Sequence, residues 1–416
     1  MAVSIFSGAP AVIAADLGGD CCADLEERVA ELEETTARKG NRKVTLTISG
    51  YVTKQIMFWD DGAESNAYIS DIGPTQATNF RLIGEATIAP GWKAGYVLRI
   101  QDLDGNSMGL NQSTPVVNLG LNTQMSYWYL ASKELGKISI GKNALAAKSA
   151  AMFTDLSGTQ LVANYVLFDG GQFFVRRDGA FTKSATGFLS WGDFGYCYAQ
   201  QRPWGGDCDG IVMDGVRYDS PTFAGFSLSA SWGEDDDWEI AGRYSGEIGG
   251  FKLALGAGYS VNTDEHTQPP PVSKDKDSAF FQAGGYAEHV ATGLFIHGAY
   301  GEEDNNGRRT LAGFVEPDSH QWYVKGGVRE QWISLGHTIL YGEYGRYIDQ
   351  LSPNALAAGA TGSEFDRFGV GAVQEIDAAS LSVWMKYREH KADVAGIGAG
   401  DLEGFRYVSV GALMNF

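Results

Sequence analysis

Two groups of charged residues are the part of this 416-residue sequence best suited to act on other molecules. The first group lies in one long stretch, 143–210, and consists of Asp155, Asp169, Asp178, Arg176 and Arg177. The second group occupies polar positions of short alternating segments elsewhere and consists of Arg81, Glu85, Arg99, Arg367, Lys386 and Arg388. Opposite charges on two sides of a water-filled space produce an electric field that orients dipolar solutes and disfavours apolar ones. These residues therefore favour the electrostatic selection of solutes over bond-breaking chemistry.

Patterns typical of catalytic and metal sites are much weaker. The six histidines are scattered, and neither a Ser/His/Asp set nor a pair of catalytic carboxylates can be identified. Asp102, Asp104 and Asn106 resemble the start of a calcium loop, but no glutamate follows at the required position, which favours a polar turn. The four cysteines lack metal-binding spacing. We therefore expect no enzymatic activity, no metal and no cofactor.

The composition limits both the partners and the class of fold. Asp plus Glu number 51 against 32 Lys plus Arg, and a formal charge of −19 argues against a nucleic-acid partner. Glycine is frequent, with 55 residues, and proline is rare, with 11. No run of 18 apolar residues occurs, so we expect no transmembrane helix. Membrane-spanning strands would give a much weaker signal.

The pattern from Lys43 onward has a period of two, which is typical of β-strands. In the final segment one face carries Val408, Val410, Met414 and the terminal Phe416. We expect about sixteen strands, at 43–58, 78–89, 91–101, 124–133, 136–142, 211–219, 225–233, 238–245, 250–261, 278–289, 293–300, 320–329, 335–347, 364–375, 380–388 and 405–416.

The connections between these strands alternate in length. Every second one is short, such as 89–91 or 246–249, and the others are mostly long and polar, such as 59–77 or 143–210. Every proline after the first 14 residues falls in a connection, as the hydrogen-bond ladder requires. An antiparallel meander with tight turns at one end and long loops at the other gives this order, and outer-membrane barrels are built in this way.

The last strand, 405–416, predicts closure, because it can pair with the first strand and leave the sheet without an edge. A sixteen-stranded barrel is too wide for side chains to fill. Its polar face must then enclose water, and its apolar face must meet lipid. A β-helix or two packed sandwiches could use similar strands, but neither predicts the alternation of long and short connections. The fold class is therefore an all-β transmembrane antiparallel barrel over 41–416.

The N-terminal residues form two further segments. Residues 1–14 resemble the end of a signal peptide without its basic region, so we expect a truncated or misassigned start. Residues 15–40 contain a helix at 21–39 with a short heptad pattern, which favours a self-associating coiled coil over a helix packed on its own domain. This helix precedes the first strand, so we place it in the periplasm.

Several stretches resemble one known family. They are ADLGGDCC, ADLEERVAELEETTARKGNRKV, VRRDG at 175–179, RYDSPTFAGFSLSASWGED at 217–235 and the terminal aromatic strand. Together they resemble the α-proteobacterial trimeric outer-membrane porins over essentially the whole mature chain. The resemblance implies sixteen strands, a homotrimer, passive diffusion of small hydrophilic solutes and a third long loop that enters the lumen. It also implies that the barrel-insertion machinery reads Phe416.

The expected constriction follows from closure of the sheet. Strands near both ends of the chain become neighbours, so Arg81, Arg99, Arg367, Lys386 and Arg388 would form one basic sector. We expect the carboxylates of loop 143–210 to face this sector across the narrowest point. The overall charge of −19 suggests a modest preference for cations, although the acidic helix and outer loops contribute to that count.

The cysteines predict one disulfide. Cys197 and Cys208 lie near the end of the long loop, and an oxidising periplasm favours a bond between them over two free thiols. Cys21 and Cys22 are adjacent, so they would link protomers or pair with other thiols of the envelope.

The function that these observations favour is a general diffusion porin of the outer membrane, in contact with lipid and lipopolysaccharide. A substrate-selective channel is the nearest alternative. A barrel enzyme would show hydrolysis, and an adhesive barrel would have a blocked lumen without conductance.

Overall fold

The computed structural model describes residues 43–73, 76–184, 187–198, 212–234, 237–263, 277–310, 312–398 and 400–416. Residues 47–416 form one compact unit. The expected signal remnant 1–14 and the expected helix within 15–40 lie outside the described residues, as do Cys21 and Cys22. These expectations stay predictions.

One antiparallel sheet of seventeen strands makes up the wall of the described part of the chain. Its strands are β1 (Thr45–Asp60), β2 (Ser65–Ser70), β3 (Asn79–Ala89), β4 (Trp92–Asp102), β5 (Leu121–Ser132), β6 (Gly136–Ala144), β9 (Val212–Asp219), β10 (Phe226–Gly233), β11 (Asp237–Ile248), β12 (Phe251–Asn262), β13 (Ser278–His289), β14 (Leu294–Asp304), β15 (Ser319–Ile333), β16 (Gly336–Ile348), β17 (Gly362–Ile376), β18 (Leu381–Ala395) and β19 (Phe405–Asn415). Both β2 and β3 pair with β1, so they share one position in the wall. The result is the expected sixteen-stranded barrel.

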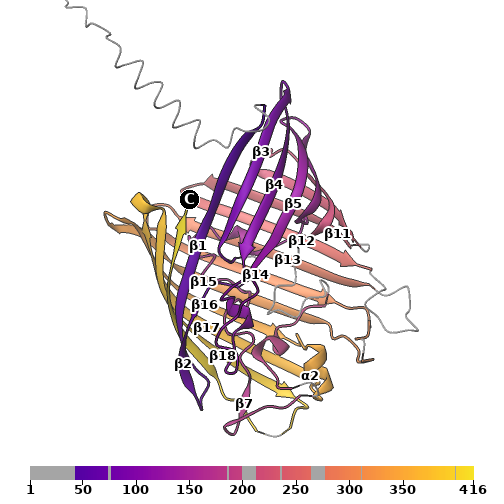
Figure 1. Ribbon diagram of the computed structural model, residues 1–416, viewed down its shortest axis with the longest axis vertical. Coiled ribbons are helices and arrows are strands. Elements are labelled where there is room, and N and C mark those ends of the chain that lie inside the picture. The colour runs from indigo at the N-terminus through magenta and orange to yellow at the C-terminus, as the bar shows by residue number, and fades with distance from the viewer. Residues whose placement is uncertain are drawn as a thin grey trace, which may run out of the picture. The chain divides into compact units, whose positions relative to one another are not determined.

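The first and last strands close the barrel. β1 pairs antiparallel with β19 from Tyr51 opposite Asn415 to Asp60 opposite Arg406. Gly50 and Phe416 exchange two backbone hydrogen bonds of 3.0 Å at the end of this seam. Figure 1 shows β1 beside the last strands of the chain along the seam. Closure leaves the wall without an unpaired edge.

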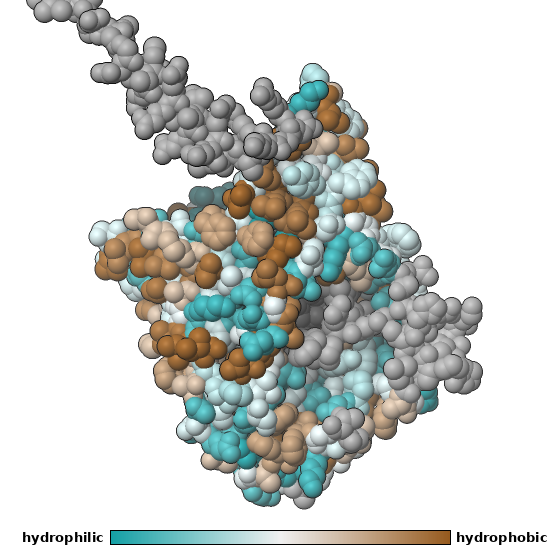
Figure 2. Space-filling model, in the orientation of Figure 1, coloured by the Kyte–Doolittle hydropathy of each residue, from teal (hydrophilic) through white to brown (hydrophobic). Residues whose placement is uncertain are grey.

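The two faces of the wall differ in chemistry, as the alternation predicted. On β1 the outward Val52, Ile56 and Phe58 are 42–51% exposed, whereas the inward Gln55 and Met57 are at most 2% exposed. Figure 2 shows apolar side chains as brown patches on the outer wall. An exposed apolar face of this extent suits hydrocarbon rather than water.

The strand predictions differ most from the structure at β2 and at the end of β18, while other strands such as β14 and β15 extend four residues beyond their predicted ends. β2 lies inside the predicted connection 59–77, because its sequence, SNAYIS, is too short and too polar to show a clear alternation. β18 continues to Ala395, seven residues beyond the predicted end, with charged Lys391 and Asp393 on its outward face. Those charges resemble a loop in the sequence, although the backbone remains in the ladder.

The remaining elements belong to connections. The hairpin of β7 (Arg176–Arg177) and β8 (Ala180–Phe181) lies within the long loop. The short helices are η1 (Ser107–Gly109), η2 (Met152–Thr154), η3 (Trp191–Phe194), α2 (Pro353–Ala357) and η5 (Asp377–Ala379). Across the described ranges no helix is long and apolar enough to cross a membrane. The buried core lies inside the barrel, where residues of the long loop such as Leu167, Phe173 and Trp191 pack against the wall.

Candidate functional site

The long loop covers a large part of the inner wall. From β13 to β19 every strand presents inward side chains that are almost completely buried: Tyr286, Phe295, His297, Tyr323, Lys325, Ile339, Glu343, Tyr347, Phe365, Arg367, Lys386, Arg388, His390, Phe405 and Tyr407. Loop residues complete the same clusters, among them Met152, Val162 and Tyr165. This side of the lumen is therefore dry, and the loop is packed onto it as a second layer.

Lys325 of β15 holds the first part of the loop. Its ammonium group lies 2.5 Å from an Asp155 carboxylate oxygen and donates to Thr159 Oγ1 and to the Ala163 carbonyl, each at 2.8 Å. The three contacts use all three donors of the ammonium group. Burial acts to raise the pKa of Asp155, but the charge of Lys325 outweighs it, so the pKa is lowered and the carboxylate stays ionised.

Lys386 of β18 holds the second part. Its Nζ lies 2.5 Å from Asp169, and Gln55 of β1 donates to the other oxygen of that carboxylate at 2.8 Å. Burial opposes ionisation of Asp169, but Lys386 offsets it and the pKa is again lowered. Asp169 thus joins strands that lie on either side of β19.

The two arginines predicted beside Lys386 are also covered by the loop. Arg367 donates to the backbone carbonyls of Asn164 and Val166, which fixes the loop between the two carboxylates. Arg388 instead forms a bidentate pair with Glu343 of β16, at 2.6 and 3.1 Å. The structure therefore brings Asp155 and Asp169 into direct contact with wall cations, rather than holding them apart from the wall across open water.

Arg176, Arg177 and Asp178 lie elsewhere, at the β7–β8 hairpin. Arg176 Nε donates to Asp61 at 2.7 Å, its Nη2 lies 3.3 Å from Glu64, and Arg177 donates to the Ile397 carbonyl. Asp178 occupies the turn with a φ of 50°. In Figure 1 β7, the end of β2 and α2 lie at the same end of the barrel. These residues fasten the loop to the connections β1–β2 and β18–β19.

On the inner wall from β3 to β6, which we call the open wall, charged side chains such as Arg81 reach solvent, although apolar neighbours such as Val97 and Tyr129 are buried. Arg81 and Arg99 stand directly opposite each other on β3 and β4, and Arg81 is exposed. Arg81 donates to Ser49 Oγ at 3.4 Å, and Arg99 Nε donates to Asn79 Oδ1 at 3.0 Å. Both arginines therefore project from the inner face of the wall.

Glu85 also lies on the open wall. It pairs with Lys93 at 2.5 Å and accepts from the Tyr129 hydroxyl at 2.9 Å. The side chains of Lys93 and Glu85 are 50% and 36% exposed. A solvated ion pair therefore sits on this wall farther along β3 than Arg81.

A family model described as Gram-negative porin matches residues 2–406 of the chain. The chain belongs to this family. No curated protein matches the chain significantly. The porin is a general diffusion channel of the outer membrane.

Solved structures with the same fold share little sequence with this porin. OmpT of Vibrio cholerae, expressed in the outer membrane, is 13% identical, with a TM-score of 0.54 over 91% of this chain and 99% of its own. The outer membrane channel DcaP of Acinetobacter baumannii is 9% identical, with a TM-score of 0.53 over 92% and 100%. OmpF of Salmonella typhi, in complex with daunomycin, is 13% identical, with a TM-score of 0.53 over 90% and 98%.

Three residues that organise the porin lumen were missed by the sequence reasoning. They are Lys325, Glu343 and Gln55, all nearly inaccessible to solvent. Each stands at an inward position of a predicted strand, so the alternation itself was the available signal. A lone lysine between aromatic and glycine residues, as in WYVKGGV, is the clearest of them.

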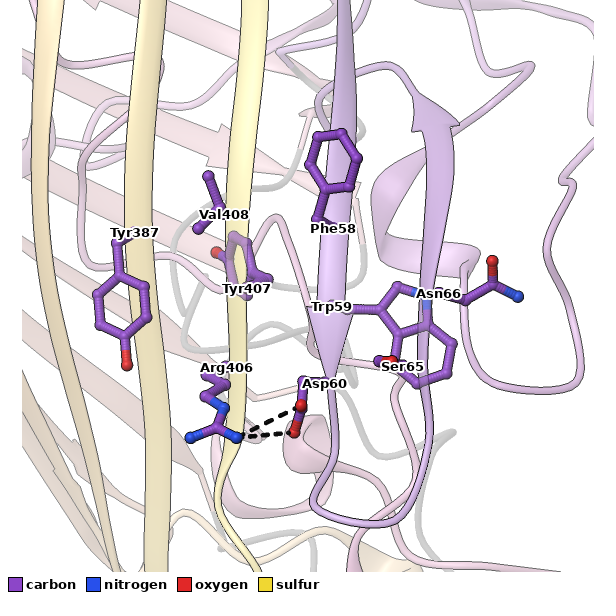
Figure 3. Close-up of a pocket in the computed structure, with 9 residues that line it drawn as sticks. All are labelled: Phe58, Trp59, Asp60, Ser65, Asn66, Tyr387, Arg406, Tyr407 and Val408. Atoms are coloured by element: carbon purple, nitrogen blue, oxygen red, sulfur yellow. Dashed lines mark hydrogen bonds and ion pairs between the residues drawn. The ribbon is translucent and has the colours of Figure 1, made fainter.

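A groove of about 390 Å³ lies at the closure seam, lined by Phe58, Trp59, Asp60, Ser65, Asn66, Tyr387, Arg406, Tyr407 and Val408. Figure 3 shows Arg406 of β19 turned toward Asp60 of β1, at 3.3 Å. The pair joins the two strands across the seam and neutralises both charges. The groove carries Phe58 and Val408 on its outward side, so it belongs to the outer surface and not to the lumen.

Of the two cysteines in the predicted disulfide, the structure describes only Cys197. Cys197 is 2% exposed and packs against Phe280, whereas Cys208 lies outside the described residues. Within the described part of the chain no group of three or more His, Cys, Asp or Glu side chains could hold a metal ion.

Proposed function

We propose that small hydrophilic solutes and ions cross the outer membrane through the passage between the packed loop and the wall from β3 to β6. The observation that carries this proposal is the contrast within one lumen. Lys325 and Lys386, on the covered wall, are at most 2% exposed, whereas Arg81, on the open wall, is in contact with solvent. Because the loop is fixed by buried ion pairs, the width of the passage is set by a rigid layer.

Swelling of liposomes that contain the purified protein, measured with sugars of increasing size, tests this function. We expect swelling rates to fall smoothly with solute size and not to saturate with concentration. Saturation would favour the alternative of a substrate-selective channel. An adhesive barrel would give no swelling, and a barrel enzyme would consume a substrate.

We assign the constriction to the predicted residues according to where they lie. Arg81, Glu85 and Arg99 would line the passage, and Asp155, Asp169, Arg367, Lys386 and Arg388 would hold the loop that narrows it. Arg176, Arg177 and Asp178 would fix the loop at the outer mouth. Conductance of single-residue variants would separate these roles. Variants of the lining residues should alter the ion preference of the channel, whereas variants of the residues that hold the loop should destabilise the loop.

We propose a homotrimer of the kind expected for the α-proteobacterial porins. Polar groups on the outward face of the wall support it: Lys54, 46% exposed, pairs with Asp71 at 2.9 Å, and Lys142 donates to the Thr123 carbonyl at 2.9 Å. Charged side chains are costly against lipid, and a neighbouring subunit would cover them. One solved structure of OmpT from Vibrio cholerae, 12% identical, is described as a trimer form. Native mass spectrometry in detergent should show three chains per particle.

Four further features are proposed: a periplasmic helix, an insertion signal, a lipid-facing surface and a disulfide. The segment 15–40 would form a periplasmic coiled coil after removal of residues 1–14, and Phe416 would serve as the signal for the barrel-insertion machinery. Lipid and lipopolysaccharide would contact the outward apolar face. A disulfide between Cys197 and Cys208 would restrain the end of the loop by roughly 2–4 kcal/mol. Electrophoretic mobility before and after reduction would detect it.

A further inference from the structure

The loop supplies no carboxylate to the open passage among its described residues, 143–184 and 187–198. Asp155 and Asp169 are buried against lysines of the wall. Asp193 accepts hydrogen bonds from Ser190 and Ser352, which fixes the turn of η3 to the start of α2. Asp178 lies in the turn of the β7–β8 hairpin, at the end of the barrel. The loop carboxylates that were expected to form the negative side of the transverse field therefore bind the loop to the wall or stabilise its turns.

The cations expected on the positive side of that field, Arg81 and Arg99, do project from the inner face of the open wall. Arg81 and Arg99 are direct cross-strand partners, so their side chains project from the same face of the sheet. Side chains of directly opposite residues lie close together, so the two positive charges act on the same part of the lumen. Arg81 donates a hydrogen bond to Ser49 and Arg99 donates one to Asn79, and both acceptors are neutral groups that orient the guanidinium groups.

A second cationic group continues the same wall. Arg217 of β9 lies 2.7 Å from Asp219, and Lys137 of β6 lies 3.4 Å from the same carboxylate. Two cations thus share this carboxylate, which leaves the group positive. Tyr127 of β5 stands opposite Val97 of β4 and Gly141 of β6, so a single strand separates the strands that carry Arg99 and Lys137.

We infer that the passage prefers anions, and that Arg81 and Arg99 are the residues that determine this preference. The inference rests on the proposed path between the loop and the open wall. It is opposite in sign to the overall charge of −19, which includes many carboxylates outside the lumen. A mobile ion responds to charges within about a Debye length, roughly 10 Å at 0.1 M salt, so the near wall outweighs distant loops.

The test is the reversal potential of the full-length protein in a planar bilayer across a tenfold gradient of KCl, begun at low salt. We expect chloride to be more permeant than potassium. Arg81→Gln should lower the chloride-to-potassium ratio by about tenfold, because one positive charge roughly 6 Å from an ion in water favours chloride and disfavours potassium by about threefold each. Arg81→Glu should lower it further, to below one. All these effects should shrink at 1 M salt, where the screening length is about 3 Å.

The matched control is Lys391→Gln, which removes one positive charge from the outer surface of β18, where the side chain is 68% exposed. It should leave the permeability ratio unchanged. Influx of a sugar acid and of an amino sugar of equal size into liposomes gives an independent readout. Collapse of the passage would slow both solutes equally, whereas loss of the Arg81 charge should slow the acid relative to the amine.

The outcomes separate this inference from the proposed function. Conductance with a preference for potassium, or a ratio that Arg81→Gln and the double variant Arg81→Gln/Arg99→Gln leave unchanged, would overturn the anion preference while the channel stands. An absence of both conductance and sugar-driven swelling would overturn the channel, and the anion preference with it.

Discussion

The ammonium nitrogen of Lys386 lies 2.5 Å from a carboxylate oxygen of Asp169, and both side chains are 1% exposed. The two residues are 217 positions apart in the chain, so this contact forms only when the loop is packed inside the closed barrel. A buried pair of this kind contributes little net stability compared with apolar packing, but the loss of one partner is severe.

Replacement of Lys386 by Met should therefore destabilise the barrel by about 3–5 kcal/mol, because Asp169 would remain as an uncompensated buried charge. The double variant Lys386→Met/Asp169→Asn should recover much of this loss. Thermal unfolding in detergent measures both. Lys391→Met is the control, since Lys391 pairs with Glu389 on the solvent side and should have little effect. Equal losses in the single and double variants would contradict the buried pair.

Acid should release the first part of the loop only at low pH. The pKa of Asp155 is lowered from 3.8, so the stability that it contributes is present above 3.8 and is lost as the pH falls through the lower, folded-state pKa. We expect constant thermal stability from pH 7 to pH 5 and a decline below pH 4. Asp155→Asn should remove part of the decline. A loss centred near pH 6 would show that another group controls docking.

The β7–β8 hairpin should depend on Arg176. The pKa of Asp61 is lowered despite its burial, chiefly by the hydrogen bond from Arg176, so Arg176→Met leaves a buried carboxylate without its cation. We expect chymotrypsin to cleave the hairpin faster, near Phe181, while the barrel remains intact. Lys183→Met, at an exposed position of the same loop, serves as control. Unchanged cleavage would show that other contacts hold the hairpin.

Lys142 should matter to assembly and not to the barrel itself. It lies opposite Asp214 on the outward face, and a charge-reversing Lys142→Glu would place like charges together. We expect the trimer to dissociate at a lower temperature in semi-native electrophoresis, with normal far-ultraviolet circular dichroism of the monomer. Arg309→Glu, in an exposed loop, provides the matched charge reversal. If the circular dichroism signal of the barrel were lost together with the trimer, Lys142 would be needed for folding of the wall itself.

Phe416 should act during insertion more than in the finished fold. Its backbone pairs with Gly50, but its ring is 60% exposed, so Phe416→Ala keeps the seam and removes only the ring. We expect slower accumulation in the outer membrane and an unchanged melting temperature after refolding. Phe226→Ala removes a ring that is equally exposed and should leave accumulation normal. If both variants accumulate alike, the terminal ring carries no signal.

The barrel could be predicted well from the sequence, because the patterns that indicate it are local and recur in almost every strand. Alternation, proline placement and the order of long and short connections each follow from strands that pair with their neighbours in the chain. The predicted strand boundaries were wrong where side chains are small or charged, as in Ser65–Ser70 and at the end of β18.

The interior could not be derived in the same way. The sequence identified Asp155 and Asp169 as important carboxylates and Lys386 as an inward cation, but it could not show that they touch. Lys325 binds Asp155 across 170 positions, and no periodicity reports a contact of that range. The expected gap between loop acids and wall cations was thus reasonable from composition, whereas the docked arrangement depends on three-dimensional packing.

The one-sided position of the loop has a consequence for the shape of the molecules that can pass. Because the loop covers the inner wall from β13 to β19, we expect the proposed route to be displaced from the barrel axis and to have a crescent-like cross-section. A slender or flat molecule can align with such a slit, whereas a compact one of equal mass meets its short dimension. Sieving should then follow the smallest diameter of a solute more closely than its molecular weight.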